Sequence, residues 1–470
     1  MKILLVVHYF LPRHQAGTEI YTAQLARRFT ELGHQVTMLA SEDSGREALR
    51  LSWVRDDWEG IPVYRLFHGE PLEFARSYTD PEIDRLFRDF LQEQKPDVVH
   101  FQHVFRLSAG MIPVCEAAGI PALITLADFW LICPPLLLLQ PGFSICPGPE
   151  PERCARCGNA IGALYAGAPG HGLVRSENAL TRAAGNLIHA ASEKAVQTAH
   201  ALKRRLPREA VDRIRQWKQG REAADPESSF QRRLALIVAR QKAMKEALAA
   251  ARLVIAPSEF LRRMTIQAGA VAPEKIIHSD YGFETGPFQG LARSAADHLR
   301  FGFIGTPVEH KGLHVAIAAM NRLQDTTAEL LVHGDLNLFP AYARRLKKTA
   351  LNPRIRFMGR FEHREIAAIL SDIDALIAPS LWFENSPLTI HEAFLARVPV
   401  VASDLGGMAE LVGPGGGRLF PAGNDDALAR LLRELIEEPA KLDQLRKTIP
   451  PVKSLDENVE ELLGIYRRFV

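Results

Sequence analysis

The sequence predicts an α/β protein of two domains, each a parallel sheet with helices on both faces, that face each other across a cleft. The chain has 470 residues, which is long enough for two domains. Residues 2–40 have the pattern strand, glycine loop, helix, strand, which is a βαβ unit. A second set of βα units opens at residue 299, after a stretch rich in Gly, Pro, Ser and Ala. Repetition of the pattern after such a linker indicates a second domain of the same class.

The first βαβ unit starts with residues 2–9, whose continuous apolar character is typical of a buried parallel strand. Gly17 lies near the end of the following loop, and residues 20–32 have helical spacing that ends at Gly33. Residues 36–40 form the next strand. Gly17 suits either a simple turn or a close approach of the backbone to a ligand, and both interpretations stay open.

Two later strands of this domain end in polar residues. Residues 96–100 lead into His103, and residues 121–126 lead into Asp128. Polar side chains at the carboxyl ends of parallel strands lie in the ligand crevice, so both residues are candidates for substrate contact. A packed or surface histidine is the alternative interpretation of His103.

Four cysteines follow in residues 133–157, a segment rich in Pro and Gly. They are Cys133, Cys146, Cys154 and Cys157, and the last two form a C-x-x-C pair. Paired thiolates at this spacing can bind one tetrahedral metal ion, so we expect a structural zinc, with an iron–sulfur cluster as the alternative. Four reduced thiols without a ligand are the other interpretation. Cys115 lies in a helical segment and is expected to stay apart as a core thiol.

A basic, helix-rich segment covers residues 176–251. Within residues 201–250, 13 Lys/Arg and 6 Asp/Glu give a local charge of +7, whereas the whole chain carries +2. The small total charge argues against a nucleic-acid partner. The segment is interpreted as a helical hairpin packed on the domain, with Arg240 on its polar, solvated face. Contact with an anionic membrane is the sharper alternative. No apolar run reaches the roughly 18 residues of a membrane helix, so we expect a cytoplasmic protein. If the basic segment contacts an anionic membrane, the protein would lie at the surface of the inner membrane.

The most informative stretch is residues 382–399, in which Glu384 and Glu392 bracket seven residues. Ser386 can cap a helix and Pro387 suits a first helical position. The free N–H groups at such a helix start attract a phosphate group. An ordinary capped helix with a surface glutamate is the alternative interpretation.

This stretch resembles the donor-sugar signature of retaining glycosyltransferases of the GT-B type, which are glycogen-synthase-like members of the glycosyl transferases group 1 superfamily, family 4. The resemblance implies two Rossmann-like domains, with a helical insertion and a four-cysteine insertion in the first. It also implies that Glu384 contacts the sugar and Glu392 the ribose hydroxyls. The residues whose backbone amides would hold the diphosphate are Asn385, Ser386, Pro387 and Leu388.

The order of further residues supports the same resemblance. Gly17, Lys311, Gly334 and Arg360 match positions that contact the donor in this family. Two positions depart from the pattern. Ala127 replaces a histidine that usually precedes Asp128, and Thr306 replaces an arginine. Either Asp128 or His103 takes over the role of the missing histidine, or catalysis is weakened.

The resemblance implies a retaining hexosyltransferase that needs no metal for transfer. The donor would be a nucleotide-diphosphate sugar and the acceptor a saccharide or a lipid-linked group, in cell-surface polysaccharide synthesis. The alternative is a catalytically weakened nucleotide-sugar-binding or scaffolding protein. We expect an acceptor domain at residues 1–288, a nucleotide-sugar-binding domain at residues 289–452, and a helix at residues 453–470 that returns to the first domain.

Overall fold

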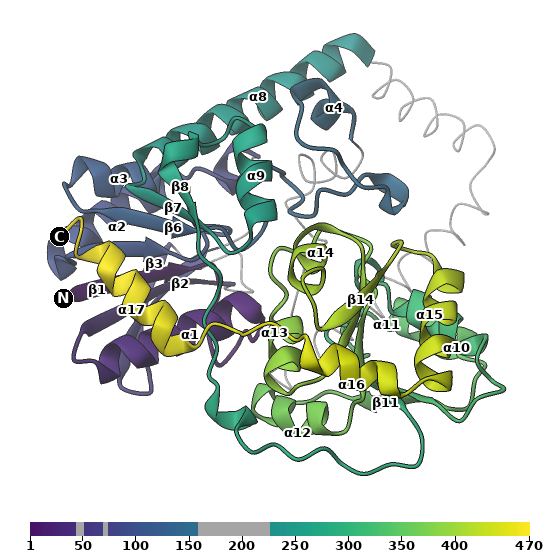
Figure 1. Ribbon diagram of the computed structural model, residues 1–470. Helices are drawn as coiled ribbons and strands as arrows, with labels where there is room; N and C mark the ends of the chain where they lie inside the picture. Colours follow the sequence, from purple (N-terminus) through teal and green to yellow (C-terminus); the bar gives the residue numbers. More distant parts are fainter. Residues whose placement is uncertain (44–50, 69–73, 158–225) are drawn as a thin grey trace, which may run out of the picture.

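The computed structural model describes residues 1–43, 51–68, 74–157 and 226–470, which form two sheets flanked by helices (Figure 1). The strand order of the first sheet is β3-β4-β2-β1-β5-β6-β7-β8, and that of the second is β11-β10-β9-β12-β13-β14. Every strand pair is parallel except β3 with β4. The predicted α/β class with two parallel sheets is therefore confirmed.

The first sheet is centred on β1, whose side chains are buried on both faces. Its strands are β1 (Lys2–Val7), β2 (Gln35–Asp43), β3 (Ser52–Trp58), β4 (Ile61–His68), β5 (Val98–Phe101), β6 (Ala122–Thr125), β7 (Leu253–Ala256) and β8 (Ile276–His278). Leu4 and Val6 enter one hydrophobic cluster, whereas Ile3 and Leu5 enter the cluster on the opposite face. This alternation explains why the strand is apolar at every position.

Helices cover both faces of the first sheet. They are α1 (Gly17–Glu31), α2 (Pro81–Gln94), α3 (Met111–Ala117), α4 (Pro151–Arg156), α8 (Pro226–Ala250), α9 (Glu259–Gln267) and α17 (Leu455–Tyr466), with short 3-10 turns η1 (Ala75–Ser77), η2 (Pro141–Phe143) and η3 (Pro273–Lys275). Cys115 is buried in α3, as expected. None of the helices in the described ranges is both long and apolar enough to span a bilayer.

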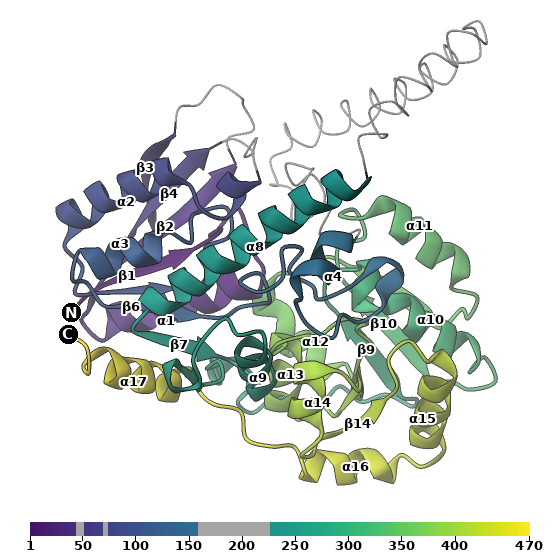
Figure 2. The ribbon, with the colours of Figure 1, turned by 90° about the horizontal axis from the view of Figure 1, so that it is seen from above.

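The long helix α8 packs against α3 and α4 (Figure 2). Arg240, expected on its polar face, is only 2% exposed. Its guanidinium donates a hydrogen bond to the carbonyl oxygen of Trp130 and lies 5.1 Å from the ring centroid of that residue. Burial lowers the pKa of Arg240 to about 10. The assignment of Arg240 to a solvated face was therefore wrong, and α8 is a packed helix. Residues 176–225 of the predicted insertion lie outside the described residues.

The second sheet has the same construction. Its strands are β9 (Arg300–Ile304), β10 (Glu329–His333), β11 (Ile355–Gly359), β12 (Ala375–Ala378), β13 (Val400–Ser403) and β14 (Gly417–Phe420). Its helices are α10 (Leu313–Asn321), α11 (Pro340–Thr349), α12 (Ile366–Ser371), α13 (Leu388–Leu395), α14 (Gly406–Val412), α15 (Asp425–Glu437) and α16 (Ala440–Lys447), with 3-10 turns η4 (Gly286–Phe288), η5 (Glu309–Lys311) and η6 (His363–Glu365).

The chain crosses between the two sheets twice, after β8 and again before α17. The two crossings run side by side, because Phe283 and Ser454 form a β-bridge. Beyond the second crossing, α17 packs against α1, and Tyr21 donates a hydrogen bond to Asn458 at 2.7 Å. Both termini consequently lie next to each other at the first sheet (Figure 1).

Candidate active site

A buried carboxylate, Glu384, lies just after β12 in the second sheet. Its Oε1 accepts hydrogen bonds from Lys311 Nζ at 2.7 Å, Ser380 Oγ at 2.8 Å and Trp382 Nε1 at 2.9 Å. Burial alone would raise the pKa of Glu384, but the charge of Lys311 and these hydrogen bonds together lower it. Glu384 is 6% exposed and is held as a carboxylate beside a cation.

Lys311 reaches Glu384 because a glycine lets two loops approach closely. Gly312 follows η5 with φ of 70°, a left-handed conformation that favours glycine. A Cβ atom at this position would collide with the carbonyl oxygen of Pro379, at the end of β12. The loop after β9 therefore packs directly on the loop after β12, which brings Lys311 to the carboxylate.

The helix start next to Glu384 differs by one residue from the prediction. Helix α13 begins at Leu388, and Pro387 precedes it with ψ of 118°, which is not helical. Ser386 does not cap the helix. Its hydroxyl donates to Asp280 Oδ1 at 2.8 Å and lies 2.8 Å from Nε2 of His391. Asp280 and His391 thus compete successfully with the backbone for this hydroxyl.

Asn385 joins the two sheets. Its Nδ2 donates to the carbonyl oxygen of Leu126 at 3.0 Å, at the end of β6, and its Oδ1 accepts from Ser258 Oγ at 2.7 Å. Nearby, a Cβ atom on Gly17 would lie 3.1 Å from Leu388 Cδ1. The structure therefore brings Gly17, Asn385 and the start of α13 together between the sheets.

Glu392 is buried in α13 and pairs with a histidine that the sequence did not single out. His363 Nε2 lies 2.6 Å from Glu392 Oε1. Burial alone would lower the pKa of His363, but the hydrogen bond and the charge of Glu392 outweigh it and raise the pKa. The contact therefore joins α13 to the 3-10 turn η6 that follows β11.

Gly334 and Arg360 follow two neighbouring strands, β10 and β11, at the same edge of the second sheet. A Cβ atom on Gly334 would collide with the carbonyl oxygen of Gly305, so a packing requirement also accounts for this glycine. Arg360 is exposed.

On the first sheet, His103 and Asp128 form a pair. The backbone N–H of Phe105 donates to His103 Nδ1 at 2.9 Å, so Nε2 carries the proton and donates to Asp128 Oδ2 at 3.1 Å. Asp128 Oδ1 accepts from the backbone N–H of Trp130 at 2.7 Å. His103 therefore holds the Asp128 carboxylate in place, and both nitrogens of its ring are used.

His8, at the end of β1, lies beside this pair. Its ring centroid is 4.5 Å from that of His103, and its Nε2 is 3.4 Å from Glu19 Oε1. Burial, followed by the nearby His103 and His14, holds the pKa of His8 well below its usual range, and burial raises the pKa of Glu19. His8 is consequently a neutral imidazole at physiological pH.

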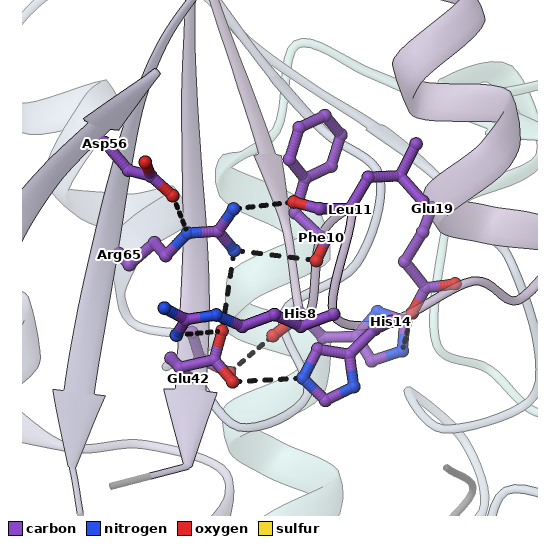
Figure 3. A network of polar contacts seen from close by, with 10 residues as sticks. His8, Phe10, Leu11, His14, Glu19, Glu42, Asp56 and Arg65 are labelled. Carbon is purple, nitrogen blue, oxygen red and sulfur yellow. Dashed lines mark hydrogen bonds and ion pairs between the residues drawn. The ribbon is translucent and has the colours of Figure 1, made fainter. Parts of the chain in front are cut away.

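A polar network fixes the loop between β1 and α1 (Figure 3). Arg65, which is 1% exposed, donates to Asp56 Oδ2 at 2.7 Å and to the carbonyl oxygen of Leu11 at 2.6 Å. Glu42 lies 3.5 Å from the same guanidinium and 3.1 Å from His14 Nε2. These contacts join β2, β3 and β4 to the loop, so they fix the position of the loop that precedes α1.

The four clustered cysteines do not form a metal site. Cys133, Cys146, Cys154 and Cys157 line one small apolar cavity. However, the described residues contain no group of three or more His, Cys, Asp or Glu that could hold a metal ion. Cys146 donates its thiol hydrogen to the carbonyl oxygen of Gly148 at 3.3 Å, and burial raises the pKa of Cys133 to about 12.

The zinc and iron–sulfur predictions are therefore not supported, and packing explains how this segment is ordered. Cys154 packs against Ile237 of α8. Arg233, also in α8, donates to the carbonyl oxygen of Ala155 at 3.0 Å, and Arg156 lies 4.1 Å from the ring centroid of Phe230. The cysteine segment, residues 133–157, is therefore packed on α8.

Sequence reasoning also missed Ser380, Trp382, Asp280 and His363. Ser380 and Trp382 lie within four residues of Glu384. Each side chain carries a hydrogen-bond donor, and this was the signal in the sequence that could have identified them as partners of Glu384. Asp280 and His363 are 106 and 29 residues from their partners, and no local pattern identifies them.

Two parts of the chain match known families. Residues 16–140 match Glycosyltransferase Family 4, and residues 293–450 match Glycosyl transferases group 1. The chain is 33% identical over 141 residues to a glycogen synthase of Mycobacterium tuberculosis, covering 29% of this chain and 34% of that protein. It is 31% identical over 142 residues to the 2-deoxystreptamine glucosyltransferase of Streptomyces kanamyceticus, covering 30% and 36%. These matches span about a third of each relative's length.

Solved structures share the fold over the whole chain. Sucrose-phosphate synthase from Thermosynechococcus elongatus has a TM-score of 0.63 at 14% identity, covering 100% of this chain and 99% of that chain. Anabaena HepE in complex with UDP and glucose has a TM-score of 0.60 at 16% identity, with both chains covered at 100%. The fold is therefore GT-B, and the two matched families are both described as glycosyltransferases.

Proposed function

We propose that the chain is a glycosyltransferase that moves a hexose from a nucleotide-diphosphate sugar to a saccharide or lipid-linked acceptor, with retention of anomeric configuration. The observation that carries this proposal is the buried Glu384 carboxylate held by Lys311 next to the start of α13. The matched relatives include a glucosyltransferase and a mannosyltransferase, which supports the same reaction type.

In this proposal the departing diphosphate is stabilised by Lys311 and by the free N–H groups at the start of α13. Both groups are fixed before the reaction, so they lower the energy of developing negative charge without reorganising. Because α13 follows Asn385, Ser386 and Pro387, these residues and Leu388 would line the phosphate group. No metal ion is required for this stabilisation.

Asp128 is the proposed catalytic group on the first sheet, and His103 is its positioning residue. Ala127 leaves no imidazole at the preceding position. The hydrogen bond from His103 keeps the Asp128 carboxylate fixed close to the segment that Asn385 binds. Glu392 would bind the ribose hydroxyls.

The remaining donor contacts are assigned to Gly17, Gly334 and Arg360. We also propose the division into an acceptor domain at residues 1–288, a donor domain at residues 289–452 and a returning helix at residues 453–470. A cytoplasmic location and contact with the inner membrane stay predictions, and the packed position of α8 gives no support to membrane contact by residues 226–250.

The alternative is a nucleotide-sugar-binding protein with weakened catalysis, which Ala127 and Thr306 favour. Thermal unfolding in the presence of UDP, GDP and ADP, alone and as their sugar conjugates, identifies the nucleotide. A ligand at about 100 times its Kd should stabilise the fold by about 2.7 kcal/mol. Release of free nucleoside diphosphate from the stabilising conjugate then distinguishes an enzyme from a binding protein.

A further inference from the structure

His363 and Glu392 form a short contact between the turn η6 and helix α13, which both belong to the second sheet's domain. His363 opens η6, which follows β11, and Glu392 lies in α13. Their Nε2 and Oε1 atoms are 2.6 Å apart, which is short for a hydrogen bond between nitrogen and oxygen. The side chain of Glu392 is 6% exposed and that of His363 is 36% exposed, so the histidine lies on the solvent side of the carboxylate.

This contact fixes the orientation of the carboxylate. An ionised carboxylate has two acceptor oxygens, and His363 occupies one position on Oε1. Without such a donor, the carboxylate would be free to rotate about its terminal bond. Held in this way, Glu392 can accept two adjacent hydroxyl groups of a ligand in a defined geometry.

A second histidine at the same edge has an unused polar atom. His333 ends β10 and is 9% exposed, and its Nε2 has no hydrogen-bond partner within the described residues. Its ring lies 6.3 Å from that of Phe361, two residues before His363, in an edge-on arrangement. Strand register places His333 opposite Gly359 of β11. A buried nitrogen without a partner is costly, so this position favours a polar ligand group beside the His363 turn.

We propose that His363 is a positioning residue that makes the donor site selective for ribonucleotides over deoxyribonucleotides. By holding Glu392 Oε1, it aligns the carboxylate with the vicinal 2′- and 3′-hydroxyls of the ribose, and a ligand that lacks one hydroxyl loses part of this contact. The inference rests on the proposed function for the assignment of Glu392 to the ribose. His363 itself is selected by the 2.6 Å contact and by its place in the turn that also holds Phe361, whose ring lies against that of His333.

The test measures binding of UDP, ADP and GDP, and of their 2′-deoxy counterparts, by calorimetry. We expect the wild-type chain to bind one ribonucleotide about tenfold more tightly than its deoxy form, the discrimination expected of one good hydrogen bond. His363→Ala should weaken ribonucleotide binding by about the same factor and leave the deoxynucleotide unchanged. His363→Gln, which can place an N–H near the position of Nε2, should restore most of the preference.

Two further variants complete the design. His363→Asn is too short to reach Glu392 and should behave like His363→Ala, which provides a second loss variant if the alanine chain does not fold. Arg364→Ala is the matched control, because the neighbouring Arg364 side chain is 82% exposed and should leave the ratio unchanged. Unchanged midpoints of thermal unfolding would show that each variant is folded.

Each result separates this inference from the proposed function. If a ribonucleotide binds but the wild type does not discriminate, or the loss variants keep the wild-type ratio, the role of His363 is contradicted and the proposed function stands. If none of the three ribonucleotides binds the wild type, both are contradicted.

Discussion

Glu384 is a buried carboxylate that remains ionised because three donors meet at one of its oxygens. Two of them, Ser380 and Trp382, are close in sequence, whereas Lys311 comes from a loop 73 residues away. The sequence identified Glu384 and Lys311 from their order along the chain, but the contact between them depends on Gly312 and on the packing of two loops. At the scale of single residues, local patterns indicated which groups matter, and only the fold shows their geometry.

The first prediction concerns this carboxylate. Glu384→Gln keeps the size of the side chain and removes its charge, so the fold should persist while turnover of the nucleotide sugar falls by about 10²-fold, or ~3 kcal/mol. The measurement is the rate of nucleoside diphosphate release.

Glu437→Gln is the matched control, because Glu437 lies on α15 with its side chain 64% exposed and should turn over like the wild type. Equal rates of turnover for Glu384→Gln and the control would show that Glu384 takes no part in the reaction.

At the scale of elements, most strands and helices could be predicted because their apolar periodicity is local. Residues 2–9 contain β1, and residues 20–32 coincide with most of α1. Two details could not be predicted, since they depend on distant partners. Ser386 turns away from the helix start to bind Asp280, and Arg240 is buried because Trp130 lies beneath it. The packing of residues 133–157 could not be predicted for the same reason, since their partner α8 is distant in sequence.

The second prediction concerns Asp84, a carboxylate of α2 that lies against Gly110 at the start of α3. Burial raises the pKa of Asp84 to about 6, from the usual 3.8 of an aspartate. The folded state therefore prefers the protonated form, and the wild type loses stability as the pH rises from about 4 through 6. Asp84→Asn removes this cost, so the variant should be more stable above pH 6, by at most about 3 kcal/mol.

Chemical denaturation from pH 4 to pH 8 provides the measurement. The stability difference between Asp84→Asn and wild type should shrink at the acidic end. Asp89→Asn is the control on the same helix, with its side chain 60% exposed, and its difference from wild type should stay small throughout. A pH-independent difference for Asp84→Asn would show that its carboxylate is not the cause.

At the scale of the whole molecule, the two sheets are joined through contacts that no local pattern indicates. Glu410 of α14 accepts hydrogen bonds from the backbone N–H groups of Glu259 and Phe260, both at 2.7 Å. It therefore caps α9, a helix that packs on the other sheet. Asn385 adds a second bridge to the end of β6.

The third prediction follows from this cap. Glu410→Ala removes the acceptor for two helix N–H groups and should lower the free energy of unfolding by about 1–2 kcal/mol. Thermal and chemical unfolding would measure the loss. Glu434→Ala is the control, because Glu434 is partly exposed and pairs with Lys441 of the same domain. This variant should lower the free energy of unfolding by less. Equal costs would mean that the contact between α14 and α9 contributes little.

The proposed function is transfer of a sugar from a nucleotide donor, with retention, by groups that lie between the two sheets. It is tested most directly by proton NMR of the purified chain incubated with the nucleotide sugar that stabilises it and with candidate saccharide acceptors. Free nucleoside diphosphate should accumulate, and the first sugar product should have the anomeric configuration of the donor. A donor that binds and remains intact in every incubation, or a product of inverted configuration, would contradict the claim.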